Sequence, residues 1–360
     1  MPAEVKFARI PHPNPASDAE RAAKMTDPVF GAVRTDHMVV IRYTEGQGWH
    51  DAELGPRGPL PLDPAAAVFH YAQEIFEGMK AYRGADGKVK LFRPEKNAQR
   101  FQISARRLAM PELPEDLFIE AVEALVKADE AWVPTEGSLY LRPFLIATEG
   151  ALGVRPSKEY MFVVIACPVG NYFKGEARAV TIWASRDYSR AVRGGTGFAK
   201  CGGNYAASLA AQAEAYANGC DQVLFVDAIE GRWIEELGGM NVFFVKKDGS
   251  LITPPLGGTI LPGVTRDSLI QLAKDQGRAV QEELYSLEQL RADAESGEVV
   301  EAFACGTAAI VVGIGQIKTP AGDFTIGDGN EGEFARSIRA ELLEIQKGAG
   351  EDRHNWVRSI

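Results

Sequence analysis

Apolar residues along the chain follow two spacings, and each spacing predicts one kind of element. Runs rich in β-branched and aromatic residues predict strands at 37–43, 138–148, 160–170, 177–185, 220–227, 232–255 and 298–317. Amphipathic repeats of the helical period predict helices at 94–109, 114–133, 206–219, 263–277, 285–297 and 334–350. The segments GADGK and KDG predict hairpin turns. Because hairpins and crossovers alternate, we expect a mixed α+β fold and not a clean doubly wound sheet.

A chain of 360 residues exceeds what one hydrophobic core usually supports, so two domains are expected. Residues 1–28, rich in proline, alanine and charge, are interpreted as a surface arm. We place a small α/β domain at 29–170 and a larger domain at 181–360. The short polar stretch within 171–180 is expected to connect them.

Composition excludes several classes of function. The net charge of −10 argues against a nucleic-acid surface and against an anionic membrane as partner. No apolar run approaches the length of about 18 residues that a membrane-spanning helix needs. The N-terminal stretch lacks the apolar core of a secretory signal. Four widely spaced cysteines and five scattered histidines suggest neither disulfides nor a metal site, so we expect a cytoplasmic protein without a metal.

The most unusual local feature is Lys200, which lies in the glycine-rich segment GGTGFAKCGGNY, just before a predicted helix. A solvated loop lysine is one interpretation. A lysine used as nucleophile and proton shuttle is the other. Two further segments suit anions: Val264 and Thr265 open a predicted helix, and ACGTAA offers Thr307 among small residues. A helix cap and tight core packing explain these two equally well.

Strand alternation places Glu235 and Glu236 on opposite faces of their strand. One carboxylate is then expected to point inward, where it needs a partner, and the other is free to be solvated. Two surface glutamates at a hairpin are the alternative.

Seven segments stand in the order found in one family: FEGMKAYR, LFRPEKNAQR, LYLRP, GGTGFAKCGGNY, EELGGMN, ILPGVTR and CGTAA. The chain resembles the class IV, fold-type-IV aminotransferases that use pyridoxal 5′-phosphate, and among them the branched-chain amino acid aminotransferases. The resemblance covers nearly the whole chain from Phe30 onward. It implies a small open α/β sandwich followed by a larger pseudo-barrel domain, in a homodimer.

The resemblance also implies residue roles. Lys200 matches the lysine that forms a Schiff base with the cofactor, and Glu236 matches the carboxylate on its pyridine nitrogen. Tyr205 matches the tyrosine on the phenolic oxygen, and Arg100 matches an arginine on the phosphate. The remaining phosphate contacts match Val264, Thr265 and Thr307. Gly239 departs from the threonine that some members carry, which removes one hydroxyl.

On the substrate side the resemblance implies aromatic pocket walls and one cation. The matching aromatic positions are Phe30, Tyr71, Phe76, Tyr140 and Tyr172. Arg142 matches an arginine for the side-chain carboxylate of glutamate, and the Thr307–Ala308 turn is expected to meet the substrate α-carboxylate. The implied reaction is a ping-pong transfer from leucine, isoleucine or valine to 2-oxoglutarate. The alternatives are a D-amino acid aminotransferase, an aminodeoxychorismate lyase, and a non-catalytic binding protein on the same scaffold.

Overall fold

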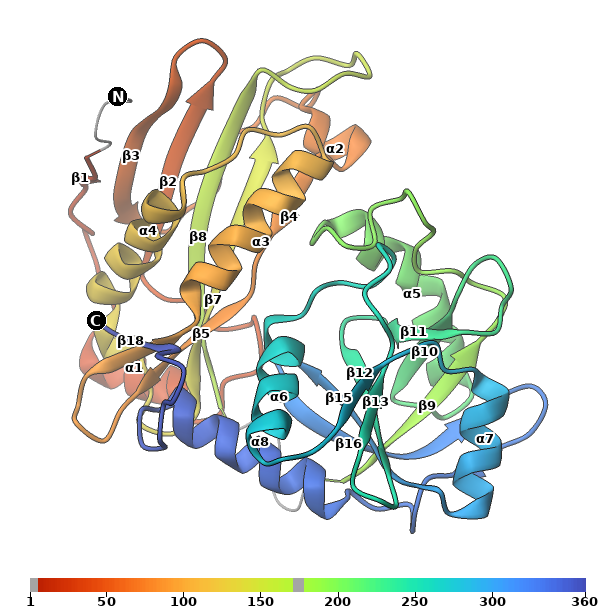
Figure 1. Ribbon diagram of the computed structural model, residues 1–360. Coiled ribbons are helices and arrows are strands. Elements are labelled where there is room, and N and C mark those ends of the chain that lie inside the picture. Colours follow the sequence, from red (N-terminus) through yellow and green to blue (C-terminus); the bar gives the residue numbers. More distant parts are fainter. Residues whose placement is uncertain (1–5, 171–177) are drawn as a thin grey trace. The chain divides into compact units, whose positions relative to one another are not determined.

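The structure is a computed structural model that describes residues 6–170 and 178–360. The chain separates into two compact units (Figure 1). Unit 1 comprises Met1–Tyr172, Ala199–Gly202 and Glu344–Ile360, and unit 2 comprises Phe173–Phe198 and Gly203–Leu343. Residues 171–177 of the expected connection, and with them Tyr172, lie outside the described residues. The domain boundaries drawn from the sequence stay a prediction.

Within the described residues, unit 1 holds a nine-stranded sheet in the order β1-β3-β2-β8-β7-β5-β6-β18, with β4 paired to β7. Its strands are β1 (Ala8–Arg9), β2 (His37–Thr44), β3 (Gly48–Pro56), β4 (Glu74–Phe76), β5 (Met79–Arg83), β6 (Val89–Phe92), β7 (Ser138–Ala147), β8 (Glu159–Val169) and β18 (Val357–Ser359). Its helices are α1 (Asp18–Met25), α2 (Ala67–Tyr71), α3 (Pro94–Arg107) and α4 (Glu115–Ala128), followed by a 3-10 turn at Glu130–Trp132.

Helices α3 and α4 cover one face of this sheet and enclose the main core of unit 1. Phe101 of α3, Phe118 of α4 and Phe162 of β8 meet there with ring centroids 5.3 to 5.8 Å apart. Alternation along the strands sends Val40 and Val163 to the opposite face, where a second apolar cluster forms. Both faces of the central strands are therefore buried, which explains their nearly continuous apolar sequence.

Unit 2 also holds nine strands in its described part, in the order β11-β10-β9-β16-β15-β12-β13-β14, with β17 paired to β16. The strands are β9 (Val180–Ser185), β10 (Gln222–Val226), β11 (Ile234–Leu237), β12 (Asn241–Lys246), β13 (Leu251–Thr253), β14 (Val280–Glu282), β15 (Val299–Gly306), β16 (Ile310–Lys318) and β17 (Phe324–Thr325). The helices are α5 (Gly202–Ala217), α6 (Val264–Asp275), α7 (Leu287–Ser296) and α8 (Glu333–Gln346), whose last residues belong to unit 1.

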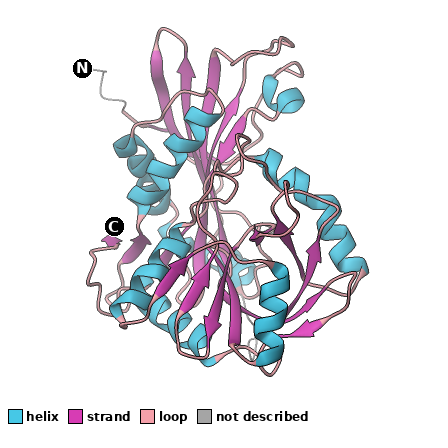
Figure 2. Cartoon of the chain, turned by 45° about the vertical axis from the view of Figure 1, so that its right-hand side comes forward, coloured by secondary structure: helices cyan, strands magenta, loops and turns pink. Residues whose placement is uncertain are grey.

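Parallel and antiparallel pairs coexist in both sheets, for example β9 with β10 and β7 with β8. The predicted mixed α+β architecture is therefore confirmed; strands and helices alternate along the chain, and Figure 2 distinguishes them by colour. Individual residues determine where several helices begin and end. Pro94 begins α3, and the Ser286 hydroxyl caps the start of α7 by accepting from Gln289 N–H. Gly297, at φ 74°, ends α7.

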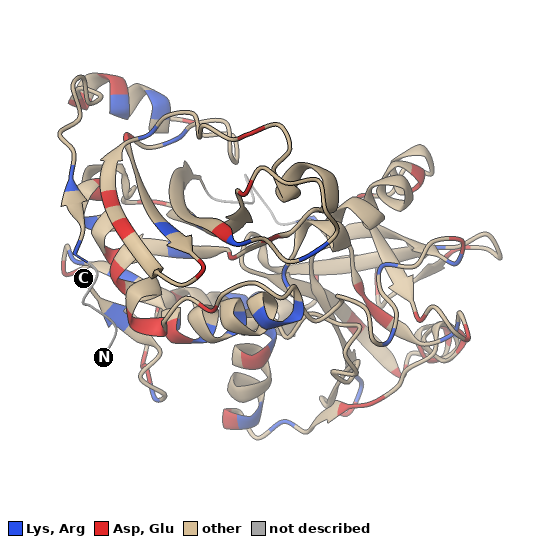
Figure 3. Cartoon of the chain, turned by 90° about the horizontal axis from the view of Figure 1, so that it is seen from above, with Lys and Arg blue, Asp and Glu red and all other residues tan. Residues whose placement is uncertain are grey.

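Acidic and basic residues are interspersed over the described helices and strands (Figure 3). Each unit has apolar core clusters with polar and charged residues buried beside them, and all four cysteines are buried and free of disulfides. In the described residues no helix is both long enough and apolar enough to cross a membrane.

Candidate active site

The segment around Lys200 is fixed to the sheet and helices of unit 1. The Lys200 carbonyl accepts from Phe76 N–H at 2.9 Å, and Lys200 N–H donates to the Ser104 hydroxyl at 2.9 Å. The flanking residues Ala199 and Cys201 are buried in the unit 1 core. The Lys200 ammonium lies 4.9 Å from the centre of the Phe76 ring. The backbone of this segment is therefore packed against the core of unit 1. It is not a solvated loop.

A buried polar face of α3 lies beside this segment, formed by Asn97, Arg100 and Ser104. The Arg100 guanidinium donates from Nε and Nη2 to the two oxygens of Glu77, each at 2.8 Å. Asn97 donates to the same carboxylate at 2.8 Å. Glu77 is fully buried, so its charge is balanced by Arg100. The bidentate partner of Arg100 in the structure is thus Glu77, which the sequence did not single out.

A small pocket of about 180 Å³ in unit 1 gathers three of the predicted substrate residues, Phe30, Tyr140 and Arg142. The Phe30 and Tyr140 rings meet edge to face at 4.9 Å. Arg142 donates to the Tyr140 hydroxyl at 3.0 Å and lies 4.7 Å from the Phe76 ring centre. The Arg142 Nε is buried without a hydrogen-bond partner. An arginine with an unsatisfied buried nitrogen is suited to an incoming carboxylate.

Tyr71 does not line this pocket. It is 42% exposed on α2, and its hydroxyl donates to the Leu152 carbonyl. The rest of the pocket wall comes from Gly31, Arg34, Ile165, Ala166 and Cys167. Burial raises the pKa of the Cys167 thiol, so this cysteine is a neutral, apolar part of the wall.

In unit 2, Glu236 on β11 is held from several sides. Its carboxylate pairs with Arg190 at 2.8 Å and accepts from Leu261 N–H at 2.9 Å and from Asn241 Nδ2 at 3.1 Å. The Arg190 and Glu236 side chains are each only 3% exposed. The buried ion pair, with its surrounding donors, keeps a carboxylate in the interior at a fixed position.

The burial of Glu235 differs from the sequence-based expectation that one of the two glutamates is solvated. Glu235 is 8% exposed, so neither glutamate is a surface residue, and the hairpin alternative for this pair is wrong. Burial raises the pKa of Glu235, while a hydrogen bond from Thr259 and the charge of Arg190 act in the opposite direction. The charge of Arg190 therefore favours the ionised form of Glu235, while its ion pair is with Glu236.

The two predicted anion loops lie close to the same strands of unit 2. Gly263 precedes α6 in an extended conformation with no side-chain cap, and a Cβ there would collide with the Asn241 side chain. Asn241 pairs with Cys305 on β15, one residue before Gly306 and the Thr307–Ala308 turn. A Cβ on Gly239 would lie 3.7 Å from the Tyr205 ring. Asn241 thus connects Glu236, the start of α6 and the strand that leads to Thr307.

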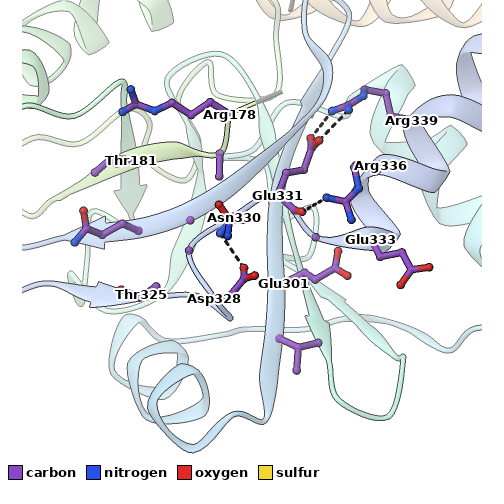
Figure 4. A pocket seen from close by; sticks show the side chains of 16 residues that line it. Arg178, Thr181, Glu301, Thr325, Asp328, Asn330, Glu331, Glu333, Arg336 and Arg339 are labelled. Carbon is purple, nitrogen blue, oxygen red and sulfur yellow. Dashed lines mark hydrogen bonds and ion pairs between the residues drawn. The ribbon is translucent and has the colours of Figure 1, made fainter. Parts of the chain in front are cut away.

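A wider polar pocket of about 1350 Å³ lies elsewhere in unit 2 (Figure 4). Several of its charged side chains have partners within the unit: Arg339 pairs with Glu331, and Glu301 accepts from Phe334 N–H and Ala335 N–H at the start of α8. None of the residues predicted for catalysis or binding lines it. In the described residues no cluster of three potential metal ligands occurs.

Comparison with known proteins gives concordant results. Residues 74–317 match the family model for amino-transferase class IV. The chain is 56% identical over 353 residues to a probable branched-chain-amino-acid aminotransferase of Streptomyces coelicolor, covering 97% of each chain.

Two solved structures share the fold. The branched-chain amino acid aminotransferase of Thermobaculum terrenum in its PLP form has a TM-score of 0.74 with 26% identity, covering 90% of this chain and 98% of that one. The branched-chain aminotransferase of the archaeon Thermoproteus uzoniensis, solved with norvaline, has a TM-score of 0.73 with 26% identity, covering 90% and 99%.

Proposed function

The chain belongs to the class IV aminotransferases, and we propose that it is a branched-chain-amino-acid transaminase that uses pyridoxal 5′-phosphate. The observation that carries the proposal is the 56% identity to a relative of that name over 97% of both chains. The motifs with Lys200 and Glu236 lie within the matched family region.

The residues present fit such a cofactor. Glu236 is a carboxylate held in a dry interior by Arg190, Asn241 and Leu261 N–H, a suitable acceptor for a protonated ring nitrogen. The uncapped start of α6 is suited to a phosphate group. When bound, the cofactor supplies the electron sink that lets the Cα–H bond of an amino acid break.

The individual roles that we propose are those that the family resemblance implies. The Lys200 amine holds the cofactor covalently and, once displaced, carries the proton from the substrate Cα. Glu236 keeps the proton on the ring nitrogen, and Tyr205 donates to the phenolic oxygen. The phosphate is bound through Val264, Thr265 and Thr307. Arg100, which is paired with Glu77, would add a positive charge for the phosphate, as the resemblance implies.

The substrate side follows from the unit 1 pocket. Phe30 and Tyr140 of this pocket, with Phe76 beside Arg142, would present aromatic surface to a branched aliphatic side chain, for which each methylene contributes about 1 kcal/mol. Arg142 binds the second carboxylate of glutamate or 2-oxoglutarate in the other half-reaction, and Thr307–Ala308 meets the α-carboxylate. The resemblance also implies Tyr172 and Tyr71, although Tyr71 does not line this pocket. We propose that the enzyme works as a homodimer in the cytoplasm, in the last step of branched-chain amino acid synthesis or in its reverse.

The test is a donor panel with 2-oxoglutarate as acceptor and glutamate formation as readout. We expect turnover of L-leucine, L-isoleucine and L-valine and none of D-alanine. Turnover of D-alanine without L-leucine favours a D-amino acid aminotransferase, and release of pyruvate from aminodeoxychorismate favours the lyase. A colourless protein that binds no pyridoxal phosphate points to a non-catalytic scaffold. Any of these three outcomes rejects the proposal.

A further inference from the structure

The main chain of the lysine segment is attached to unit 1 by three hydrogen bonds within residues 200–202. Phe76 N–H on β4 donates to the Lys200 carbonyl, and Lys200 N–H donates to the Ser104 hydroxyl on α3. Gly202 N–H donates to the Glu74 carboxylate, also on β4. One of these bonds is between backbone groups, and the other two depend on side chains that the proposed chemistry does not use.

Ser104 occupies a dry position. Its side chain is fully buried, and its hydroxyl donates to the Arg100 carbonyl at 2.9 Å while accepting from Lys200 N–H. A buried hydroxyl that uses both its donor and its acceptor fixes the groups on either side of it. Ser104 therefore connects the backbone of Arg100 to the backbone of Lys200.

Glu74 keeps a carboxylate where burial opposes its charge. Desolvation raises its pKa, while Gly202 N–H and the charge of Arg142 favour the ionised form. Gly202 is the first residue of α5, so the carboxylate also lies at the positive end of a helix. A Cβ on Gly202 would collide with the Glu74 carboxylate, so a glycine is needed for this approach. An apolar residue at 74 would avoid the desolvation cost and lose the bond to Gly202.

We propose that Glu74 and Ser104 are positioning residues that hold the backbone of residues 200–202 and thereby place the Lys200 amine for its reaction. The inference rests on the proposed role of Lys200. A displaced amine meets the cofactor carbonyl and the substrate proton at poorer geometry. Misplacement of a reacting group by about 1 Å can cost about a hundredfold in rate.

The experiment compares five variants of the full-length protein. Ser104→Ala and Glu74→Ala remove the side-chain bonds to the segment, and Glu74→Gln keeps an oxygen that can accept from Gly202 N–H. Ser208→Ala is the matched control for the serine, because Ser208 is also a buried helix serine bonded to the carbonyl four residues earlier. Glu301→Ala is the control for the glutamate, since Glu301 likewise accepts from N–H groups at a helix start.

Three readouts separate positioning from general stability. The first is the rate at which apoprotein mixed with pyridoxal phosphate develops the absorbance of the lysine adduct. The second is kcat and KM for L-leucine, and the third is Tm. We expect Ser104→Ala and Glu74→Ala to lower kcat and the adduct rate by about 10- to 100-fold with KM nearly unchanged. Glu74→Gln is expected to recover most of the loss, and both controls to match the wild type in rate.

The outcomes distinguish this inference from the function on which it rests. If the wild type forms no adduct, the proposed function fails. If it does, and the Ser104 and Glu74 variants react like the wild type, the positioning role is wrong. The positioning role of Glu74 is also wrong if Glu74→Gln reacts as slowly as Glu74→Ala. In that case the reaction rate depends on the charge of Glu74 and not on its bond to Gly202 N–H. Should one variant fail to fold, the other decides the question alone, since both bonds hold the same three residues.

Discussion

Replacing Arg190 by methionine tests the electrostatic design of unit 2. Methionine keeps much of the length and apolar stem of arginine but leaves Glu236 buried without its cation. The pair is joined at 2.8 Å with both side chains 3% exposed, so water cannot compensate for the lost charge. Arg190 also donates to the Thr259 carbonyl at 2.9 Å, and that bond disappears too.

Removing one member of a buried pair costs about 3–5 kcal/mol. The Leu261 N–H and Asn241 donors to Glu236 remain, which favours the lower end of that range. For domains of about 150–250 residues, 1 kcal/mol shifts Tm by about 2–4 °C. We therefore expect Arg190→Met to lower the Tm of the apoprotein by about 6–12 °C.

The assay is calorimetry of the apoprotein as a double-mutant cycle. Glu236→Gln alone removes the carboxylate that Arg190 pairs with and is expected to destabilise as well. The double variant Arg190→Met/Glu236→Gln has neither buried charge, so it should be more stable than Arg190→Met alone. A drop of less than about 2 °C for Arg190→Met would refute the reasoning. So would a double variant whose two losses simply add.

Three further predictions concern Arg142, Gly78 and Lys80. Arg142→Met should raise KM for 2-oxoglutarate at least about tenfold, because a charged hydrogen bond contributes about 1.5–3 kcal/mol. KM for L-leucine should stay nearly unchanged. An equal rise in both KM values would contradict this prediction. Gly78→Ala should lower the affinity for the same acid, because its Cβ collides with the Tyr140 hydroxyl that Arg142 contacts, and steady-state kinetics with both substrates measure the effect. Burial lowers the pKa of Lys80 from 10.5 to about 8, so ionised Lys80 costs about 3 kcal/mol at pH 7. Stability should then rise with pH between about 8 and 10.5, and Lys80→Met should be more stable than wild type at pH 7 but not near pH 10.5; unfolding monitored across this pH range decides it.

The sequence predicted most elements because their periodicity is strong. Strands β7 and β8 are long apolar runs, and α3 and α4 carry amphipathic repeats that begin near a proline. Strand β3 gave no such signal: Gly48–Pro56 is polar and contains glycine and proline, and it forms by antiparallel pairing with β2. Helix α1 lies in the segment interpreted as an arm, and the capping box of Ser17 and Glu20 is the local sequence signal for its start.

The sequence proposes a site residue where a motif surrounds it, as at Lys200 and Glu236, and the roles of both stay predictions. The residues that support them were not predictable, because they come from distant parts of the chain. Arg190 lies 46 positions before Glu236, and Ser104 lies 96 positions before Lys200. One signal was available: Asn97, Arg100 and Ser104 recur at helical spacing on the side of α3 that faces the core. Polar residues on a buried helix face require partners, and here these are Glu77 and Lys200.

The central claim is that Lys200 is the covalent anchor of the cofactor. Purified protein incubated with pyridoxal phosphate is reduced with borohydride, digested and mapped by mass spectrometry, beside a Lys200→Ala variant. The account predicts a single phosphopyridoxyl group on Lys200, released as the pyridoxamine form when L-leucine is added before reduction. A label on another lysine, or transamination retained by Lys200→Ala, would contradict it.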